Sequence, residues 1–146
     1  TNADGDFAPS TDPPTLPTDL DVTGAAYTRN PGATAGTFVT TLYGIDSAND
    51  RLVRSGGPDG GAPGGSPNAG QTFAVDTLRD AATFEAVDFG PQNGFDIEPG
   101  TDAAFAVNGT TLYAVNLTTA GVTNQGTIGG GLTLRGRRLR TIRAIR

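Results

Sequence analysis

The fold is decided by the stretch AAFAVNGTTLYAVN, residues 103–116. Two short runs of apolar, aromatic and β-branched residues flank the pair Asn108-Gly109. Asn-Gly between two such runs is the strongest short-range signal for a hairpin, because a type I′ turn needs positive φ at both central positions. We therefore predict an antiparallel hairpin here, with its turn at Asn108-Gly109.

Short strands separated by turns extend this pattern over most of the chain. The 146 residues include 22 Gly and 10 Pro, which mark turns, and 36% are hydrophobic, with a net charge of only −5, which argues against disorder. No amphipathic helical period is present before the C-terminal tail. The sequence predicts an all-β domain over residues 20–134, with strands at 20–22, 25–28, 37–45, 51–54, 72–76, 82–89, 94–97 and 120–128.

An internal repeat organises these strands. Thr40–Asp46 matches Thr110–Asn116 at a separation of 70 residues, which predicts two units at about 20–56 and 94–130. The Gly/Pro-rich loop 55–71 is the best candidate for a boundary inside the chain. Two four-stranded, propeller-like units fit this arrangement, and a single β-sandwich is the alternative. Tyr27, Tyr43 and Tyr113 are expected to pack in the core or between sheets.

Five motifs in fixed order give a family resemblance. They are Gly24–Thr28, Thr41–Asp46, Gly94–Ile97, Leu112–Thr119 and Leu134–Gly136. Together they resemble a family of secreted bacterial proteins that has a domain of unknown function with propeller-like Leu-Tyr-x-Ile/Val-Asp/Asn repeats. The resemblance covers residues 1–137 and corresponds to the C-terminal part of that longer domain. It implies an exported, non-enzymatic β protein, and it supplies no catalytic residues.

The composition excludes several kinds of chemistry. The chain has no His, Cys, Met or Trp, and all ten basic residues are Arg. Ser-His-Asp triads, thiol nucleophiles, zinc fingers and lysine Schiff bases are therefore impossible. A carboxylate-only glycoside hydrolase, using the pairs Asp96 and Glu98 or Glu85 and Asp88, is the remaining enzymatic alternative. We expect no enzyme activity and no cofactor, because aromatic platforms for a sugar are scarce.

Charge divides the chain into an acidic body and a basic tail. Residues 1–134 carry four arginines and all fifteen acidic residues, whereas residues 135–146 carry six arginines. The acidic body disfavours nucleic-acid binding, and no apolar run is long enough to span a membrane. The tail is interpreted as an assembly segment, with a solvent-facing terminal strand or an anionic-surface contact as alternatives. Its candidate assembly residues are Arg135, Arg137, Arg138, Leu139, Arg140, Ile142, Arg143, Ile145 and Arg146.

The N-terminal residues 1–19 contain four prolines and are predicted to form an extended arm. Asn2, Asp4 and Asp6 alternate as oxygen ligands of a calcium loop would, but Phe7 and Pro13 stand where an EF-type loop requires Gly and Glu. A solvated turn is the alternative to a calcium site.

Two Asn-x-Thr sequons, at Asn108 and Asn116, are candidate glycosylation sites. At Asn108 the predicted turn provides another reason for an asparagine.

The sequence as a whole indicates an extracellular or cell-surface structural protein that forms a homo-oligomer or polymer. An incomplete repeat series leaves a strand edge that a neighbour's terminal segment can pair, as in a filament or surface layer. A monomeric secreted binding module for calcium or carbohydrate is the alternative function.

Overall fold

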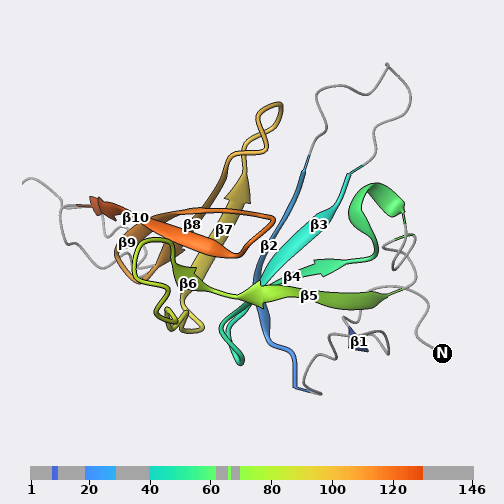
Figure 1. Cartoon of the computed structure of the whole chain (residues 1–146), viewed down its shortest axis with the longest axis horizontal. Coiled ribbons are helices and arrows are strands. Elements are labelled where there is room, and N and C mark those ends of the chain that lie inside the picture. The colour runs from blue at the N-terminus through green and yellow to red at the C-terminus, as the bar shows by residue number, and fades with distance from the viewer. Residues whose placement is uncertain (1–7, 10–18, 29–39, 62–65, 67–69, 130–146) are drawn as a thin grey trace, which may run out of the picture.

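A computed structural model describes residues 8–9, 19–28, 40–61, 66 and 70–129 of the chain (Figure 1). Apart from one 3₁₀ turn, η1 (Pro58–Gly60), its regular structure consists of β-strands, so the predicted all-β class is confirmed. The strands are β1 (Ala8–Pro9), β2 (Val22–Tyr27), β3 (Leu42–Asp46), β4 (Arg51–Ser55), β5 (Gln71–Thr77), β6 (Arg79–Asp80), β7 (Asn93–Ile97), β8 (Ala104–Asn108), β9 (Thr111–Val115) and β10 (Gly121–Thr127).

The ten strands form two five-stranded sheets of the same design. Their orders are β1-β5-β4-β3-β2 and β6-β10-β9-β8-β7. In each sheet four consecutive strands form an antiparallel meander, β2 to β5 in the first and β7 to β10 in the second. The last strand of each meander also pairs in parallel with a two-residue strand that precedes the meander in the chain. The structural repeat is therefore a short strand followed by a four-stranded meander.

The two sheets pack together, with β2 of the first beside β7 of the second (Figure 1). Their shared core consists of fully or nearly fully buried side chains, namely Ile45, Leu52, Leu78, Phe89, Ile97, Ala104, Ala106, Val115, Ala120 and Val122. Burial of each Leu, Ile, Val or Phe contributes about 1.5–3 kcal/mol, so this core is the main source of stability. Phe89 and Tyr113 add a tilted aromatic contact with ring centroids 5.5 Å apart.

Gly24 allows β2 and β7 to approach closely. A Cβ at this position would lie 3.0 Å from the Phe95 Cβ and 3.1 Å from the Phe95 backbone nitrogen. Beside this contact, the Asn93 side-chain amide donates hydrogen bonds to the Thr23 hydroxyl at 2.6 Å and to the Gly90 carbonyl at 2.8 Å. The close approach of the next sheet therefore favours a glycine on β2, because a side chain there would crowd β7.

Two aspartates fix the tight connection between β3 and β4. Asp46 is completely buried, and its carboxylate accepts hydrogen bonds from the Asp21 and Ala48 backbone N–H groups and from the Asn49 amide. These bonds compensate the cost of burying a charge. Asp50 joins the sheets, since its carbonyl accepts the N–H of Leu78 and its carboxylate accepts that of Phe89.

The hairpin at residues 103–116 is confirmed, but its turn is one residue further along the chain than predicted. Asn108 pairs with Thr111 on the ladder, so the two loop residues are Gly109 and Thr110. Gly109 has φ of +61°, whereas Asn108 does not have positive φ. A two-residue turn with positive φ only at its first position resembles type II′, for which Gly at that position suffices.

Three other sequence-based interpretations need correction. The strand predicted at 82–89 is a turn followed by loop, with a single bridge between Arg79 and Ala86. Loop 55–71 connects β4 and β5, neighbours in one sheet, so it is not a boundary between the sheets. The two Leu-Tyr motifs are not structurally equivalent, because Leu42-Tyr43 lies on the second strand of its meander and Leu112-Tyr113 on the third.

Within the described ranges, no helix has the length and hydropathy needed to cross a membrane. The calcium candidates Asn2, Asp4 and Asp6 and the tail 135–146 lie outside the described residues. Of the three tyrosines, Tyr43 and Tyr113 pack against the core as predicted, whereas Tyr27 is 55% exposed.

Candidate functional site

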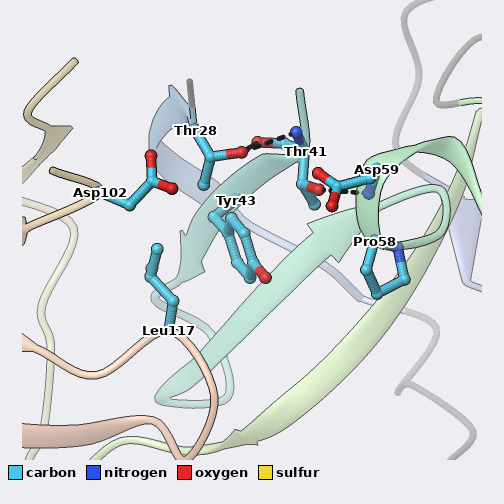
Figure 2. Close-up of a pocket in the computed structure, with 7 residues that line it drawn as sticks. All are labelled: Thr28, Thr41, Tyr43, Pro58, Asp59, Asp102 and Leu117. Atoms are coloured by element: carbon cyan, nitrogen blue, oxygen red, sulfur yellow. Dashed lines mark hydrogen bonds between the residues drawn. The ribbon is translucent and has the colours of Figure 1, made fainter. Parts of the chain in front are cut away.

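A pocket of about 270 Å³ opens where the ends of the two sheets meet (Figure 2). The first sheet contributes most of its walls, and the loops of the second sheet supply the rest. Tyr43 lies in the middle, between Leu117 on one side and Pro58 on the other. The lining residues are Thr28, Thr41, Tyr43, Pro58, Asp59, Asp102 and Leu117.

Hydrogen bonds hold one wall of this pocket in place. The backbone N–H of Thr41 donates to the Thr28 hydroxyl at 2.9 Å, and the Thr28 N–H donates to the Thr41 carbonyl at 3.0 Å. The Asp59 N–H in turn donates to the Thr41 hydroxyl at 2.8 Å. Both threonines are buried, so this network positions the η1 turn, and with it Asp59, relative to β2 and β3.

The two aspartates of the pocket both adopt unusual backbone conformations. Asp59 has φ of +53° and Asp102 has φ of +55°. Aspartate tolerates this left-handed region better than most residues, which explains its use in the turns Pro58-Asp59-Gly60 and Thr101-Asp102. The turns bring these carboxylates, 43 positions apart in the sequence, to the same pocket.

Burial raises the pKa of the Tyr43 phenol above its usual value. The Arg54 guanidinium opposes this shift, and the charges of Asp59 and Asp102 add to it. Burial likewise lowers the pKa of Arg54, whose guanidinium lies 4.7 Å from the centre of the Phe73 ring. Tyr43 therefore stays protonated at neutral pH, so it can donate a hydrogen bond but cannot act as a base.

The pocket thus presents a protonated phenol, two carboxylates and hydroxyl oxygens beside small apolar surfaces. These groups suit hydrogen bonding to a hydroxylated small molecule. Among the described residues, no three acidic side chains come together in the way that a metal site requires.

The carboxylates predicted for glycoside hydrolysis lie elsewhere. Asp96 and Glu98 are both exposed, and Glu98 accepts a 2.6 Å hydrogen bond from the Thr101 hydroxyl. Glu85 and Asp88 are also exposed, in the loop between β6 and β7. None of the four lines the pocket.

The two sequon asparagines have structural partners. The Asn108 side chain is half-buried and donates to the Asp88 carbonyl at 2.6 Å. Asn116 is exposed, and its side-chain oxygen accepts the N–H groups of Thr118 and Thr119, which shapes the turn before β10. Asn116 also borders a second hollow of about 290 Å³.

A second candidate site is the face of the second sheet that points away from the first, here called the outer face. The core-facing residues of this sheet include Phe95, Ala106 and Tyr113, which pair across the strands. Because side chains alternate along a strand, their neighbours point outward. The outer face is formed by Gly94, Asp96, Phe105, Val107, Leu112 and Ala114.

The outer face is more apolar than an ordinary solvent-facing surface. Phe105 is 39% exposed, and Val107 and Leu112 are only half-buried. Sequence reasoning missed this face, because it placed Phe105 and Leu112 on the two strands of a hairpin without assigning their side chains to a face. The alternation within that hairpin could have shown that one set of side chains had to face outward.

The fold and these sites define an all-β protein made of two repeated, packed sheets. The chain belongs to the family described as Domain of unknown function (DUF4394), whose match covers residues 1–137. No significant match was found among curated proteins or among solved structures.

Proposed function

We propose that this chain is an extracellular structural protein that self-assembles, as in a filament or surface layer. The observation that carries the proposal is the repeat itself: the first sheet is covered by a second sheet of the same design, and the outer face of that second sheet is open. Sheets of this kind are stable in series, because each covers the apolar face of the one before it. Propeller-like stacking would be one arrangement of this kind.

The charge distribution supports contacts between copies. The acidic residues all lie in positions 1–134, and six of the ten arginines lie in positions 135–146. An acidic body and a basic terminal segment attract each other between copies and disfavour a symmetric contact between like regions. A chain without His, Cys, Lys, Met or Trp also offers few reactive side chains, which suits an exposed material.

The first test is the assembly state of the full chain. Light scattering after size exclusion, together with negative-stain microscopy, should show oligomers or polymers whose size grows with protein concentration. A monomer at every accessible concentration would contradict the proposal. In a matched pair, replacing the six tail arginines by Gln should shorten the polymers, whereas replacing Arg79, an exposed arginine of the body, should not.

Small-ligand binding is the second candidate function, and the pocket around Tyr43 favours it. Its carboxylates and hydroxyls could hold a carbohydrate, and calcium is the other ligand suggested by the acidic loops. Titration calorimetry with monosaccharides and with calcium chloride tests both. Heat that disappears in Asp59→Asn, but persists in the exposed-site control Asp76→Asn, would place the ligand in this pocket. Absence of heat with every ligand would remove this candidate.

A further inference from the structure

We propose that the outer face of the second sheet binds the β2 side of the first sheet in another copy of this chain, so that copies stack head to tail. This inference rests on the proposed self-assembly and names the two surfaces that meet. Its basis is a position-by-position correspondence between the two sheets, visible only once their strand registers are known.

Along one row, the residue types of the outer face match those on the face of the first sheet that packs against the second sheet. On the first sheet, Gly24, Ile45 and Leu52 pair across β2, β3 and β4 and face the second sheet. On the second sheet, Gly94, Val107 and Leu112 pair across β7, β8 and β9 and face outward. Glycine, a β-branched residue and leucine therefore occupy the same three places in both rows.

The next row agrees at one of its three positions and differs at the other two. Tyr43 on the first sheet corresponds to Phe105 on the second, so an aromatic ring occupies both places. Ala26, which packs against the core, corresponds to the exposed Asp96. Arg54, the partner of Tyr43 on β4, corresponds to Ala114, so each row has one charged residue, at opposite ends of the row.

The two equivalent glycines differ in what lies opposite them. A Cβ on Gly24 would press on Phe95 of the second sheet at 3.0 Å, whereas a Cβ on Gly94 would have no atom within 4 Å. Neither glycine has positive φ, so backbone conformation requires neither of them. At Gly24 a glycine is favoured because a neighbouring sheet leaves little room for a side chain. At Gly94 a glycine would be favoured in the same way if a sheet from another copy bound there.

The surface that would bind over Gly94 in a neighbouring copy is exposed on the first sheet of the same chain. Phe95 and Ile97 of β7 cover the Gly24 row, and their counterparts in the first repeat are Ala25 and Tyr27 of β2. Both are exposed, Tyr27 by 55%. Because Gly24 and Ala26 face the second sheet, Ala25 and Tyr27 point to the opposite side.

The two surfaces lie on opposite sides of the molecule and differ from each other. Contact between unlike surfaces is heterologous, so each copy keeps one free surface of each kind after binding. Such stacking produces an open filament with two different ends, unless the rotation between copies closes a ring.

Gly94→Val tests the outer face directly, because a Cβ at position 94 has no atom within 4 Å in the isolated chain, whereas the valine side chain would collide with a bound sheet. We expect unchanged thermal stability in dilute protein and an increase of at least about tenfold in the dissociation constant for self-association. Phe105→Asp should act in the same direction, and Asp96→Ala should strengthen association. Phe84→Asp is the control, since Phe84 is 73% exposed but lies on the β6–β7 loop, and its φ of +62° suits aspartate.

A mixing experiment tests the pairing of unlike surfaces. Gly94→Val and Tyr27→Asp should each prevent growth, yet an equimolar mixture should form dimers, since each variant retains the surface that the other lacks. Assembly that Gly94→Val abolishes and Tyr27→Asp leaves intact would overturn the head-to-tail pairing. Polymers unaffected by either variant would overturn the inference while leaving self-assembly standing. A monomeric wild-type chain would overturn both.

Discussion

The close approach at Gly24 predicts opposite effects for the same substitution at two equivalent positions. Gly24→Ala should destabilise the isolated chain, whereas Gly94→Ala should leave it unchanged or stabilise it. Both glycines are in the first strand of a meander, and both lack positive φ, so alanine carries no backbone penalty at either. The main difference between them is the sheet packed on Gly24, although Gly24 also adjoins a register shift in the pairing of β2 with β3.

The size of the effect follows from three distances. The new methyl group at position 24 would lie 3.0 Å from the Phe95 Cβ, 3.1 Å from the Phe95 nitrogen and 3.1 Å from the Asn93 side-chain oxygen. Carbon atoms prefer about 3.5–4.0 Å, so β2 and β7 must separate by about 0.5 Å. Two of the three atoms belong to the β7 backbone or its Cβ, so rotation of a side chain cannot relieve the contact.

Overpacking of this kind costs about 1–3 kcal/mol, and replacing glycine offsets about 0.4–1 kcal/mol through the unfolded chain. We expect a net loss of about 1–2 kcal/mol for Gly24→Ala and a gain of up to about 1 kcal/mol for Gly94→Ala. Urea unfolding of dilute protein measures both, and each kcal/mol should move the melting temperature by about 2–4 °C. Equal effects at the two positions would refute the packing argument on which the repeat correspondence depends.

Three further predictions concern the core, the pocket and a surface turn. Phe89→Ala should lower the free energy of unfolding by about 3–5 kcal/mol, because its ring is fully buried, and urea unfolding measures the loss. Asp59→Asn should lower the pKa of Tyr43, because it removes a nearby negative charge. Ultraviolet titration of tyrosinate measures this change, with Tyr43→Phe as the reference. Because folding raises the pKa of Tyr43, the free energy of unfolding should fall as the pH rises above about 10. Backbone N–H groups that donate hydrogen bonds to the Asp80 carboxylate lower its pKa. The stabilisation that this carboxylate gives the folded chain should therefore be lost as the pH falls below about 4. Asp80→Asn should weaken this dependence of the melting temperature on acid.

Local features of the fold could be predicted from the sequence, and long-range pairings could not. The hairpin around Gly109 and the strand at residues 120–128 follow from nearby turn residues and apolar alternation. The parallel pairing of β6 with β10 has no such signal, because two residues carry no period and the partner is about 40 positions away. The prediction of a strand at 82–89 was wrong because a local apolar pattern is present there without burial: Phe84 and Ala86 are apolar but exposed.

The error in aligning the two Leu-Tyr motifs has a physical cause. The second and third strands of a meander have similar environments, with one face on the core and neighbours on both edges, so similar sequences suit both. Only the register, fixed by pairs such as Gly44 with Val53 and Ala106 with Tyr113, identifies the strand. The pocket was not predicted either, because Asp59 and Asp102, far apart in the sequence, come together only when the two sheets pack.

The connection between the sheets explains why the repeat begins before each meander. Leu78, the one residue between β5 and β6, is fully buried in the shared core. Its N–H donates to the Asp50 carbonyl of the first sheet, and its own carbonyl accepts the N–H of Val87, in the loop that leads to β7. The chain thus leaves the first sheet at β5 and enters the second at β6, beside β10, before it reaches β7. The second sheet therefore gains its fifth strand, β6, from the segment that joins it to the first sheet, and β1, the corresponding strand of the first sheet, likewise precedes its meander in the chain.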